Sequence, residues 1–117
     1  MPIVDITGFT EEEAGEMTAV ETAIQEAFKE RWGLRRLDTT TVNFLACLNI
    51  KTSPDIHVMA RVTTIRFDEM EKDEIEEVCW EVQKLLEQHG GHVFSEAWAH
   101  GYPNVMCGGW KEGYRPA

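Results

Sequence analysis

The segment MTAVETAIQEAF, residues 17–28, decides the fold, because its apolar pattern returns as IEEVCWEVQKLL at residues 75–86. Apolar residues spaced three and four positions apart lie on one side of an α-helix, which has about 3.6 residues per turn. A shift of 58 positions matches the apolar set Met17, Val20, Ile24, Ala27 and Phe28 to the set Ile75, Val78, Val82, Leu85 and Leu86. The chain therefore carries one amphipathic helix pattern twice.

Both helices have start and stop signals in the sequence. Thr10 and Glu13 have the spacing of a capping box, in which the glutamate carboxylate accepts the backbone N–H of the threonine. The first helix is predicted over residues 11–31. The other predicted ends are Gly33 after the first helix, and a cap at Asp68 and a stop at Gly90-Gly91 for the second helix.

Four segments rich in β-branched and aromatic residues flank the two helices. They are residues 2–7, 39–48, 56–65 and 92–99. Each half is therefore strand–helix–strand, and so short a unit implies a right-handed crossover with parallel strands. We predict an α/β (α+β) fold, a duplicated β-α-β in which one four-stranded sheet carries both helices on one face.

The whole chain, residues 1–117, is expected to form a single domain. The half-repeats are expected at about 1–50 and 56–100, followed by a glycine-rich tail at 101–117 with turns and a short hairpin. Residues 44–48, FLACL, are apolar on both sides of their strand, as burial of both sheet faces requires. We therefore expect the sheet face without helices to be buried by self-association.

Composition and charge limit the partners. The formal charge of −10 argues against nucleic acid and anionic membranes, because both require a basic surface. No apolar run reaches the roughly 20 residues of a membrane span, and the N-terminus lacks the features of a secretory signal. Cys47, Cys79 and Cys107 form no CxxC pair and are interpreted as free thiols of a reducing compartment. We expect a cytoplasmic protein.

A β-α-β repeat that opens with Met-Pro-Ile-Val resembles the tautomerase superfamily, which includes 4-oxalocrotonate tautomerase and macrophage migration inhibitory factor. The turn Ile65-Arg66-Phe67-Asp68-Glu69 resembles the place where members carry a substrate-binding arginine before a short acidic cap. The likeness extends to a poorly characterised branch of small tautomerase-like proteins. It implies a homotrimer whose sheets surround a central barrel, with pockets near the N-terminal prolines.

The resemblance also implies a chemistry for Pro2, which becomes a secondary amine if Met1 is removed. An α-amine has an ordinary pKa of about 7.7–8.0, and both burial and a nearby guanidinium lower it. Such a base can move a proton alpha to a carbonyl near neutral pH. We expect a tautomerase-like isomerase acting on an enol or 2-oxo acid, with Pro2 as general base and Arg66 as carboxylate anchor. A proline that only opens an edge strand is the structural alternative.

Two positions depart from the pattern of that superfamily. Phe9 stands where the first half would carry an arginine, and Asn43 stands where small tautomerases carry a second one. We therefore expect a small-molecule substrate with one carboxylate, and we include Phe9 and Asn43 among the substrate-binding candidates. Asp38, at the entry to the second strand, could orient a water or the proline, or could form only a turn.

Other functions were weighed against this one. His89, His92, His100 and Cys107 do not complete a recognised metal spacing, and the glycines between the first two fit a helix stop better. We expect no metal and no cofactor. The alternative function is a non-catalytic ligand-binding or oligomeric interaction module with the ferredoxin-like βαββαβ order. A central antiparallel pair of the first and third strands would indicate that alternative.

Overall fold

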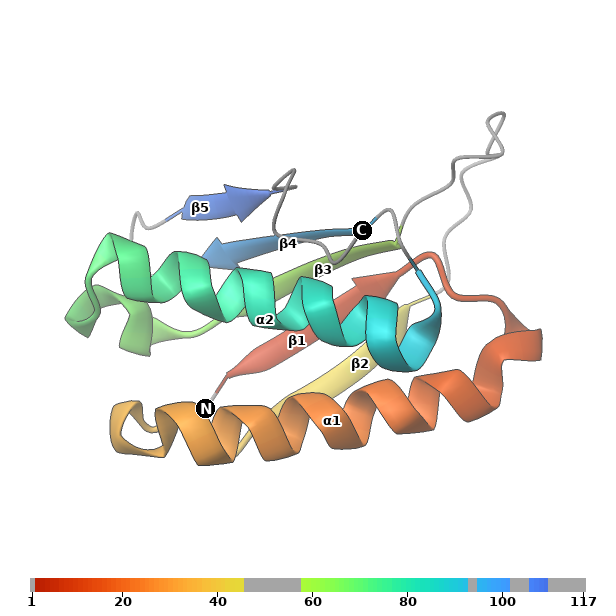
Figure 1. Ribbon diagram of the computed structural model, residues 1–117. Coiled ribbons are helices and arrows are strands. Elements are labelled where there is room, and N and C mark those ends of the chain that lie inside the picture. The colour runs from red at the N-terminus through yellow and green to blue at the C-terminus, as the bar shows by residue number, and fades with distance from the viewer. Residues whose placement is uncertain (1, 46–57, 93–94, 102–105, 110–117) are drawn as a thin grey trace.

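The structure is a computed structural model that describes residues 2–45, 58–92, 95–101 and 106–109, the last range by its backbone. The elements in chain order are β1 (Ile3–Thr7), a 3-10 turn (Glu11–Glu13), α1 (Ala14–Trp32), a 3-10 turn (Gly33–Arg35), β2 (Thr41–Leu45), β3 (Val58–Thr63), a 3-10 turn (Ile65–Glu69), α2 (Lys72–Gly90), β4 (Ser95–His100) and β5 (Met106–Gly109) (Figure 1). The predicted strand residues 46–48, 56 and 57, with Cys47, lie outside the described residues.

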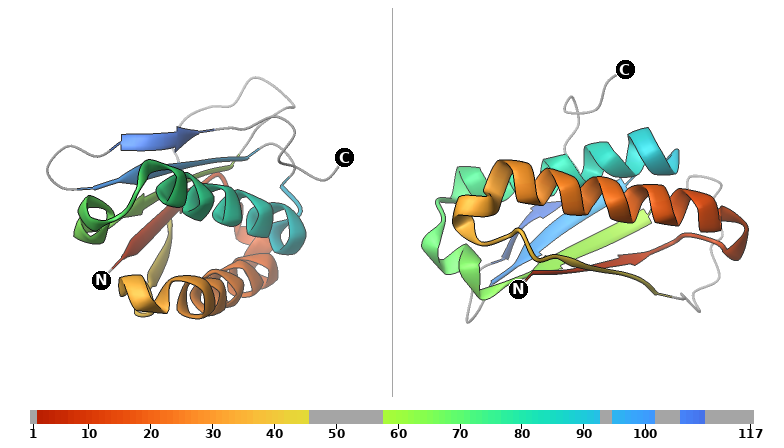
Figure 2. Two further views of the ribbon diagram at one scale, coloured as in Figure 1. Left: turned by 60° about the vertical axis from the view of Figure 1, so that its left-hand side comes forward. Right: turned by 90° about the horizontal axis from the view of Figure 1, so that it is seen from below.

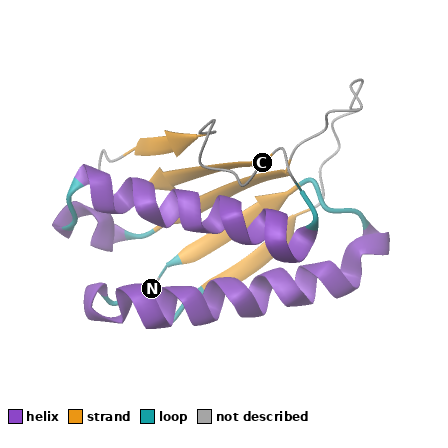
Figure 3. Cartoon of the chain, viewed as in Figure 1, coloured by secondary structure: helices purple, strands orange, loops and turns teal. Residues whose placement is uncertain are grey.

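The described strands form one sheet in the order β2-β1-β3-β4-β5. β1 is parallel to β2, β3 is parallel to β4, and the central pair β1 and β3 is antiparallel. Figures 2 and 3 show α1 and α2 together on one face of this sheet. The predicted duplicated β-α-β with its four-stranded sheet is confirmed. β5 extends the sheet by pairing antiparallel with β4.

The strand order also decides between the two fold readings. The central antiparallel pair occurs, as the ferredoxin-like reading required. In that split arrangement, however, the two strands of each β-α-β unit are separated by another strand. Here β1 lies directly beside β2, and β3 lies directly beside β4. The antiparallel central pair was therefore an insufficient criterion, and the adjacency of the parallel strands shows the unsplit arrangement.

The core lies between the helices and the sheet. Alternate strand residues point to the helices and are buried: Val4, Ile6, Val42, Val58, Ala60, Val62, Ala97 and Ala99. The two repeated helix stripes cover them, with Val20, Ile24 and Phe28 from α1 and Ile75, Val78, Val82, Leu85 and Leu86 from α2 buried. Met17 and Ala27 are half-buried. The matched apolar stripes thus form the helical side of one core, as their spacing predicts.

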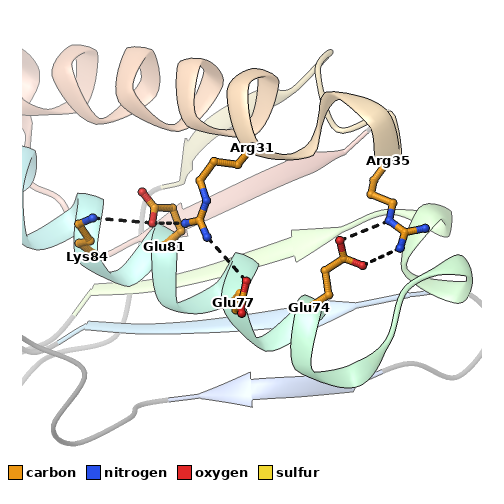
Figure 4. Close-up of polar contacts among 6 residues, drawn as sticks. All are labelled: Arg31, Arg35, Glu74, Glu77, Glu81 and Lys84. Carbon is orange, nitrogen blue, oxygen red and sulfur yellow. Dashed lines mark hydrogen bonds and ion pairs between the residues drawn. The ribbon is translucent and has the colours of Figure 1, made fainter.

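Ion pairs join the two helices above the core (Figure 4). The Arg31 guanidinium lies 2.6 Å from the Glu81 carboxylate and 3.7 Å from that of Glu77. Glu81 is buried, and a buried charge requires such a partner. Arg35, just beyond α1, pairs with Glu74 at 3.0 Å. The acidic side of α2 therefore meets the basic end of α1, where the helix dipole also favours cations.

The predicted end of α1 at Gly33 is confirmed, but without the left-handed conformation of a glycine stop, and the predicted cap of α2 at Asp68 is wrong. Gly33 has a right-handed conformation and continues into a 3-10 turn, and the left-handed position that ends it is occupied by Arg36 with φ 62°. Asp68 does not cap α2, because it lies inside the 3-10 turn Ile65–Glu69. The chain becomes extended at Met70 and Glu71 before α2 begins at Lys72. The stop at Gly91, with φ 71°, and the Thr10–Glu13 capping box are confirmed.

Glu13 also connects the start of α1 to the segment after α2. Its carboxylate accepts the Thr10 backbone N–H at 2.9 Å and lies 2.6 Å from His92 Nε2. Burial opposes ionisation of this carboxyl, but the hydrogen bonds from Thr10 and His92 outweigh it, so the pKa of Glu13 is lowered from its ordinary value. The charged form is therefore favoured in the folded protein.

We expect this contact to make the stability depend on pH. Because the pKa of Glu13 is lower in the folded protein than in the unfolded chain, its charge adds stability above about pH 4.3, and that stability is lost as pH falls through the folded pKa. Glu13→Gln should lower the free energy of unfolding by about 1 kcal/mol at pH 7, and less at pH 3. Urea unfolding across this range measures both. Glu12→Gln, in the same turn, is the control. A difference in the free energy of unfolding between Glu13→Gln and the wild type that does not change with pH would contradict the prediction.

Candidate functional site

The antiparallel pairing of β1 and β3 brings Pro2 and Arg66 to the same end of the sheet. Ile3 is the partner of Thr63, so the residue before Ile3 and the turn after Thr63 lie at the same end of the sheet (Figure 1). Pro2 is buried, and its carbonyl accepts the backbone N–H of Thr41 at 3.0 Å. These contacts hold the start of the chain against the beginning of β2.

Asp38 lies near this end as well. It is an exposed residue of the loop before β2, and β2 begins at Thr41 beside Ile3. The parallel pairing of β1 and β2 therefore places the entry to β2 at the end where Pro2 lies. Of the candidate residues, Pro2, Arg66 and Asp38 share this end of the sheet.

Arg66 has unused hydrogen-bonding capacity. Its backbone N–H donates to the Thr64 hydroxyl at 3.1 Å, which fixes the start of the turn. Its side chain is 27% exposed, and its Nη1 lies 3.6 Å from the Glu69 carboxylate. Its Nε is buried without a hydrogen-bond partner in the described chain. A guanidinium with spare donors can bind a carboxylate through paired, charge-assisted hydrogen bonds, whereas an exposed ion pair such as that to Glu69 is weak.

Asn43 and Phe9 lie elsewhere in the chain. Asn43 is on the sheet face away from the helices, where its Nδ2 donates to the Asp5 carboxylate at 3.1 Å. Phe9 follows the opposite end of β1, and its ring contacts the rings of Phe44 and His92 at centroid distances of 5.1 and 4.5 Å. A Cβ atom at Gly90 would lie 2.8 Å from the Phe9 ring. Within one chain, the structure does not bring these two residues together with Pro2.

A pocket of about 370 Å³ lies on the sheet face away from the helices, and we call it the open-face pocket. Its lining comes from four strands: Asp5 and Thr7, Leu45, Met59 and Arg61, and Trp98 and His100. Sequence reasoning did not identify this pocket. The sequence does contain one relevant signal, the alternation of side chains along each strand, which puts these residues on one face. It does not show which strands are neighbours in the sheet.

The described residues contain no group of three histidine, cysteine, aspartate or glutamate side chains that could hold a metal ion. His89 ends α2 and His92 contacts Glu13, whereas His100 is at the far end of β4, opposite Thr63. The predicted histidine set is therefore divided between the two ends of the sheet. Cys79 is buried in α2, and the side chain of Cys107 lies outside the described residues. Neither described α-helix has the length and hydropathy needed to cross a membrane.

No family model matches this sequence, and no curated protein matches it. Solved structures do match. Pt0534 inactivated by 2-oxo-3-pentynoate has a TM-score of 0.57 and 14% identity, over 97% of this chain and 93% of that chain. Macrophage migration inhibitory factor from Giardia lamblia has a TM-score of 0.50 and 14% identity, over 82% and 96%. The macrophage migration inhibitory factor-like protein from Entamoeba histolytica has a TM-score of 0.50 and 15% identity, over 91% and 98%.

These likenesses cover most of each chain, although few residues are identical. In this chain, the strands are ordered so that two parallel β-α-β units meet at an antiparallel central pair, and the likenesses extend over both units. Since structures at such low identity share an architecture and not necessarily a chemistry, the function must be argued from the site. The chain has the fold of macrophage migration inhibitory factor, which is the tautomerase-type fold.

Proposed function

We propose that this protein is a tautomerase-like isomerase that acts on an enol or 2-oxo acid. Pro2, freed by removal of Met1, is the general base, and Arg66 is the carboxylate anchor. The observation that carries the proposal is the pairing of Ile3 with Thr63, which puts the start of β1 and the Arg66 turn at one end of the sheet. The inactivation of a protein of similar fold, Pt0534, by 2-oxo-3-pentynoate supports a 2-oxo acid as the substrate class.

The proposed reaction moves one proton and leaves the substrate otherwise unchanged. The Pro2 nitrogen removes a proton from the enol hydroxyl or the α-carbon, and the proton returns at the other position. The negative charge that develops on the enolate oxygen requires nearby donors. In general, an apolar surrounding and a nearby guanidinium both lower the pKa of an α-amine, which favours the neutral, basic form that the proposal requires. Asp38 is proposed to orient the amine or a water at this end.

The proposed substrate carries one carboxylate. Arg66 has unused donors. Arg35 also donates to the Arg66 turn, at the Glu69 carbonyl, but its guanidinium is paired with Glu74. Holding a second carboxylate would require Arg35 to leave that partner. Asn43 stays on the open sheet face beside Asp5 and adds no positive charge. A monocarboxylate is therefore the best match to the charges at this end.

Labelling with 2-oxo-3-pentynoate tests the proposal. A free Pro2 amine is expected to add to the alkyne, so that an N–C bond forms, an alkyne π bond is lost, and the amine proton passes to carbon. Peptide mapping should find one adduct per chain on an N-terminal peptide that lacks Met1. A form with an N-terminal extension keeps Pro2 as an amide and should stay unlabelled there. Retention of Met1, or labelling only at other residues, would overturn the assignment of Pro2.

We also propose that copies of the chain associate through the open sheet face as a homotrimer. Ile3, Leu45 and Met59 on this face are 37%, 43% and 44% exposed, and Trp98 beside them is half-buried. Covering such a patch removes apolar area from water. Sedimentation at micromolar protein should show a species about three times the 13.4 kDa chain. Met59→Glu should lower the mass of the sedimenting species. A wild-type protein that sediments only as a 13.4 kDa monomer would contradict the proposal.

A further inference from the structure

Arg61 lines the open-face pocket and has no ion-pair partner among the residues that the structure describes. Its neighbours on the sheet form a row across the strands, because Asn43 pairs with Asp5, Asp5 with Arg61, and Arg61 with Trp98. All four are on the face away from the helices, where Arg61 is exposed and Trp98 is half-buried. The row thus places one cation between a carboxylate and an aromatic ring.

The carboxylate beside Arg61 has another partner. Asp5 accepts the Asn43 Nδ2 at 3.1 Å, from the strand on the far side of Asp5. No ion pair or hydrogen bond joins Arg61 to Asp5 or to any other residue of the described chain. The cation–aromatic contact that the structure contains involves Arg31 and Trp32, and not Arg61 and Trp98. Within the described chain, the N–H donors of the Arg61 guanidinium therefore have no partner, and they belong to a residue that lines the pocket.

The rest of the pocket is suited to an apolar body. Leu45, Met59 and Trp98 supply aliphatic, thioether and indole surface, and Thr7 and His100 are the remaining polar groups besides Asp5 and Arg61. The volume of about 370 Å³ is at the lower end of the range for small-molecule sites. Such sites combine apolar walls with a few polar groups that fix the orientation of the ligand. A compact molecule with one anionic group fits both features.

We propose that the open-face pocket binds a small monoanion with an apolar or aromatic body, whose carboxylate pairs with Arg61. Arg61 is inside β3 on the open face, whereas Arg66 follows the end of that strand, so the two guanidinium groups are distinct anchors. The His100 part of the pocket lining reaches the end of the sheet where Pro2 lies. Association of copies through this face would remove water from Arg61. A bound carboxylate would then neutralise a charge that is unfavourable to bury alone.

Calorimetric titration with 3-phenylpropionate tests the site. This probe has an aromatic body and one carboxylate but no keto or enol group, so it is not a substrate of the proposed reaction. The probe has the single carboxylate that Arg66 is proposed to hold, so it is titrated into both the wild type and Arg66→Gln. We expect one site per chain at the open-face pocket, and that site should remain in Arg66→Gln. The neutral analogue 3-phenylpropanamide should bind at least about tenfold more weakly, because it cannot form charge-assisted bonds with the guanidinium.

Variants locate the binding on the protein. Arg61→Gln should weaken binding of 3-phenylpropionate at least about tenfold. Arg36→Gln, which removes the charge of another exposed arginine, should bind as the wild type does. Arg66→Gln, at the Pro2 end, should keep the open-face site. Backbone amide shifts on titration should be largest at Thr7, Met59 and Arg61. Arg61 is exposed, so its variant should keep the wild-type thermal transition.

Several results would overturn the proposal. They are no binding at about 1 mM free probe, equal binding of the acid and its amide by the wild type, and unchanged binding by Arg61→Gln. Loss of binding in Arg66→Gln alone would place the anion at the Pro2 end and would support the isomerase proposal instead. The proposal would also be overturned if Arg61 pairs with a carboxylate of a second copy of the chain. In that case the wild type would not bind the probe, and Arg61→Gln would self-associate more weakly than the wild type.

Discussion

Pro2→Ala is expected to lower the rate of phenylpyruvate ketonisation by about 10²- to 10⁴-fold, the usual contribution of a positioned general base. An N-terminal alanine keeps an amine, but it is a primary amine without the ring that fixes the nitrogen at the start of β1. Arg66 and the strand pairing at this end would remain, so substrate binding should change less than turnover. The rate is followed by ultraviolet absorbance, and a 2-hydroxydienoate is the second substrate to test.

The matched control for this variant is Ile3→Val, one residue along the same strand. Ile3 is on the open face and 37% exposed, so loss of one methylene leaves the amine and the Thr41–Pro2 hydrogen bond in place. Its rate should stay close to that of the wild type. Equal rates for Pro2→Ala and the wild type would remove Pro2 from the mechanism. Turnover by a form that retains Met1 would do the same, since Pro2 is then an amide.

Leu86→Ala is expected to lower the free energy of unfolding by about 2–5 kcal/mol. Leu86 is fully buried in α2 and belongs to the repeated apolar stripe. Removing its side-chain carbons loses their burial and leaves a cavity that the neighbouring side chains fill only in part. Its counterpart in the first half is Phe28, which is also fully buried, so the two stripes meet the same core.

Leu34→Ala is the matched control, because it makes the same chemical change at a leucine that is fully exposed. Its free energy of unfolding should stay within about 0.5 kcal/mol of the wild type. Urea unfolding measures both variants, and an unchanged dependence on denaturant shows that the change is in stability alone. Equal losses in Leu34→Ala and Leu86→Ala would contradict the assignment of the α2 stripe to the core.

Much of the fold could be predicted, because its signals are local. The spacing of Val20, Ile24 and Phe28 places them on one side of α1 whatever lies around them, and the same pattern at residues 75–86 indicated a repeated unit. The ends of the helices were predicted less well. Gly33 and Asp68 both have the chemistry of helix ends, but a neighbouring 3-10 turn includes each of them. A residue type indicates what a position allows, and the surrounding contacts determine which allowed conformation is used.

The candidate sites show where local signals end. Pro2 and Arg66 are 64 positions apart, and their common location depends on the antiparallel pairing of β1 with β3. The open-face pocket depends on the same pairing and on that of β3 with β4. Alternation along each strand could predict which residues share a face. It could not predict which strands are neighbours, because that depends on contacts between distant segments.

By itself, the sequence determined the positions of the helices and strands and the repeated β-α-β unit, because hydrophobic periodicity acts over a few residues. Only the tertiary structure decided which arginines are free. Arg31 and Arg35 are paired with glutamates of α2, about 40 to 50 positions away along the chain. Arg61 has no such partner in the described chain, where the aspartate beside it accepts a hydrogen bond from Asn43. Charge pairing requires proximity in space, and the order of residues along the chain does not contain it.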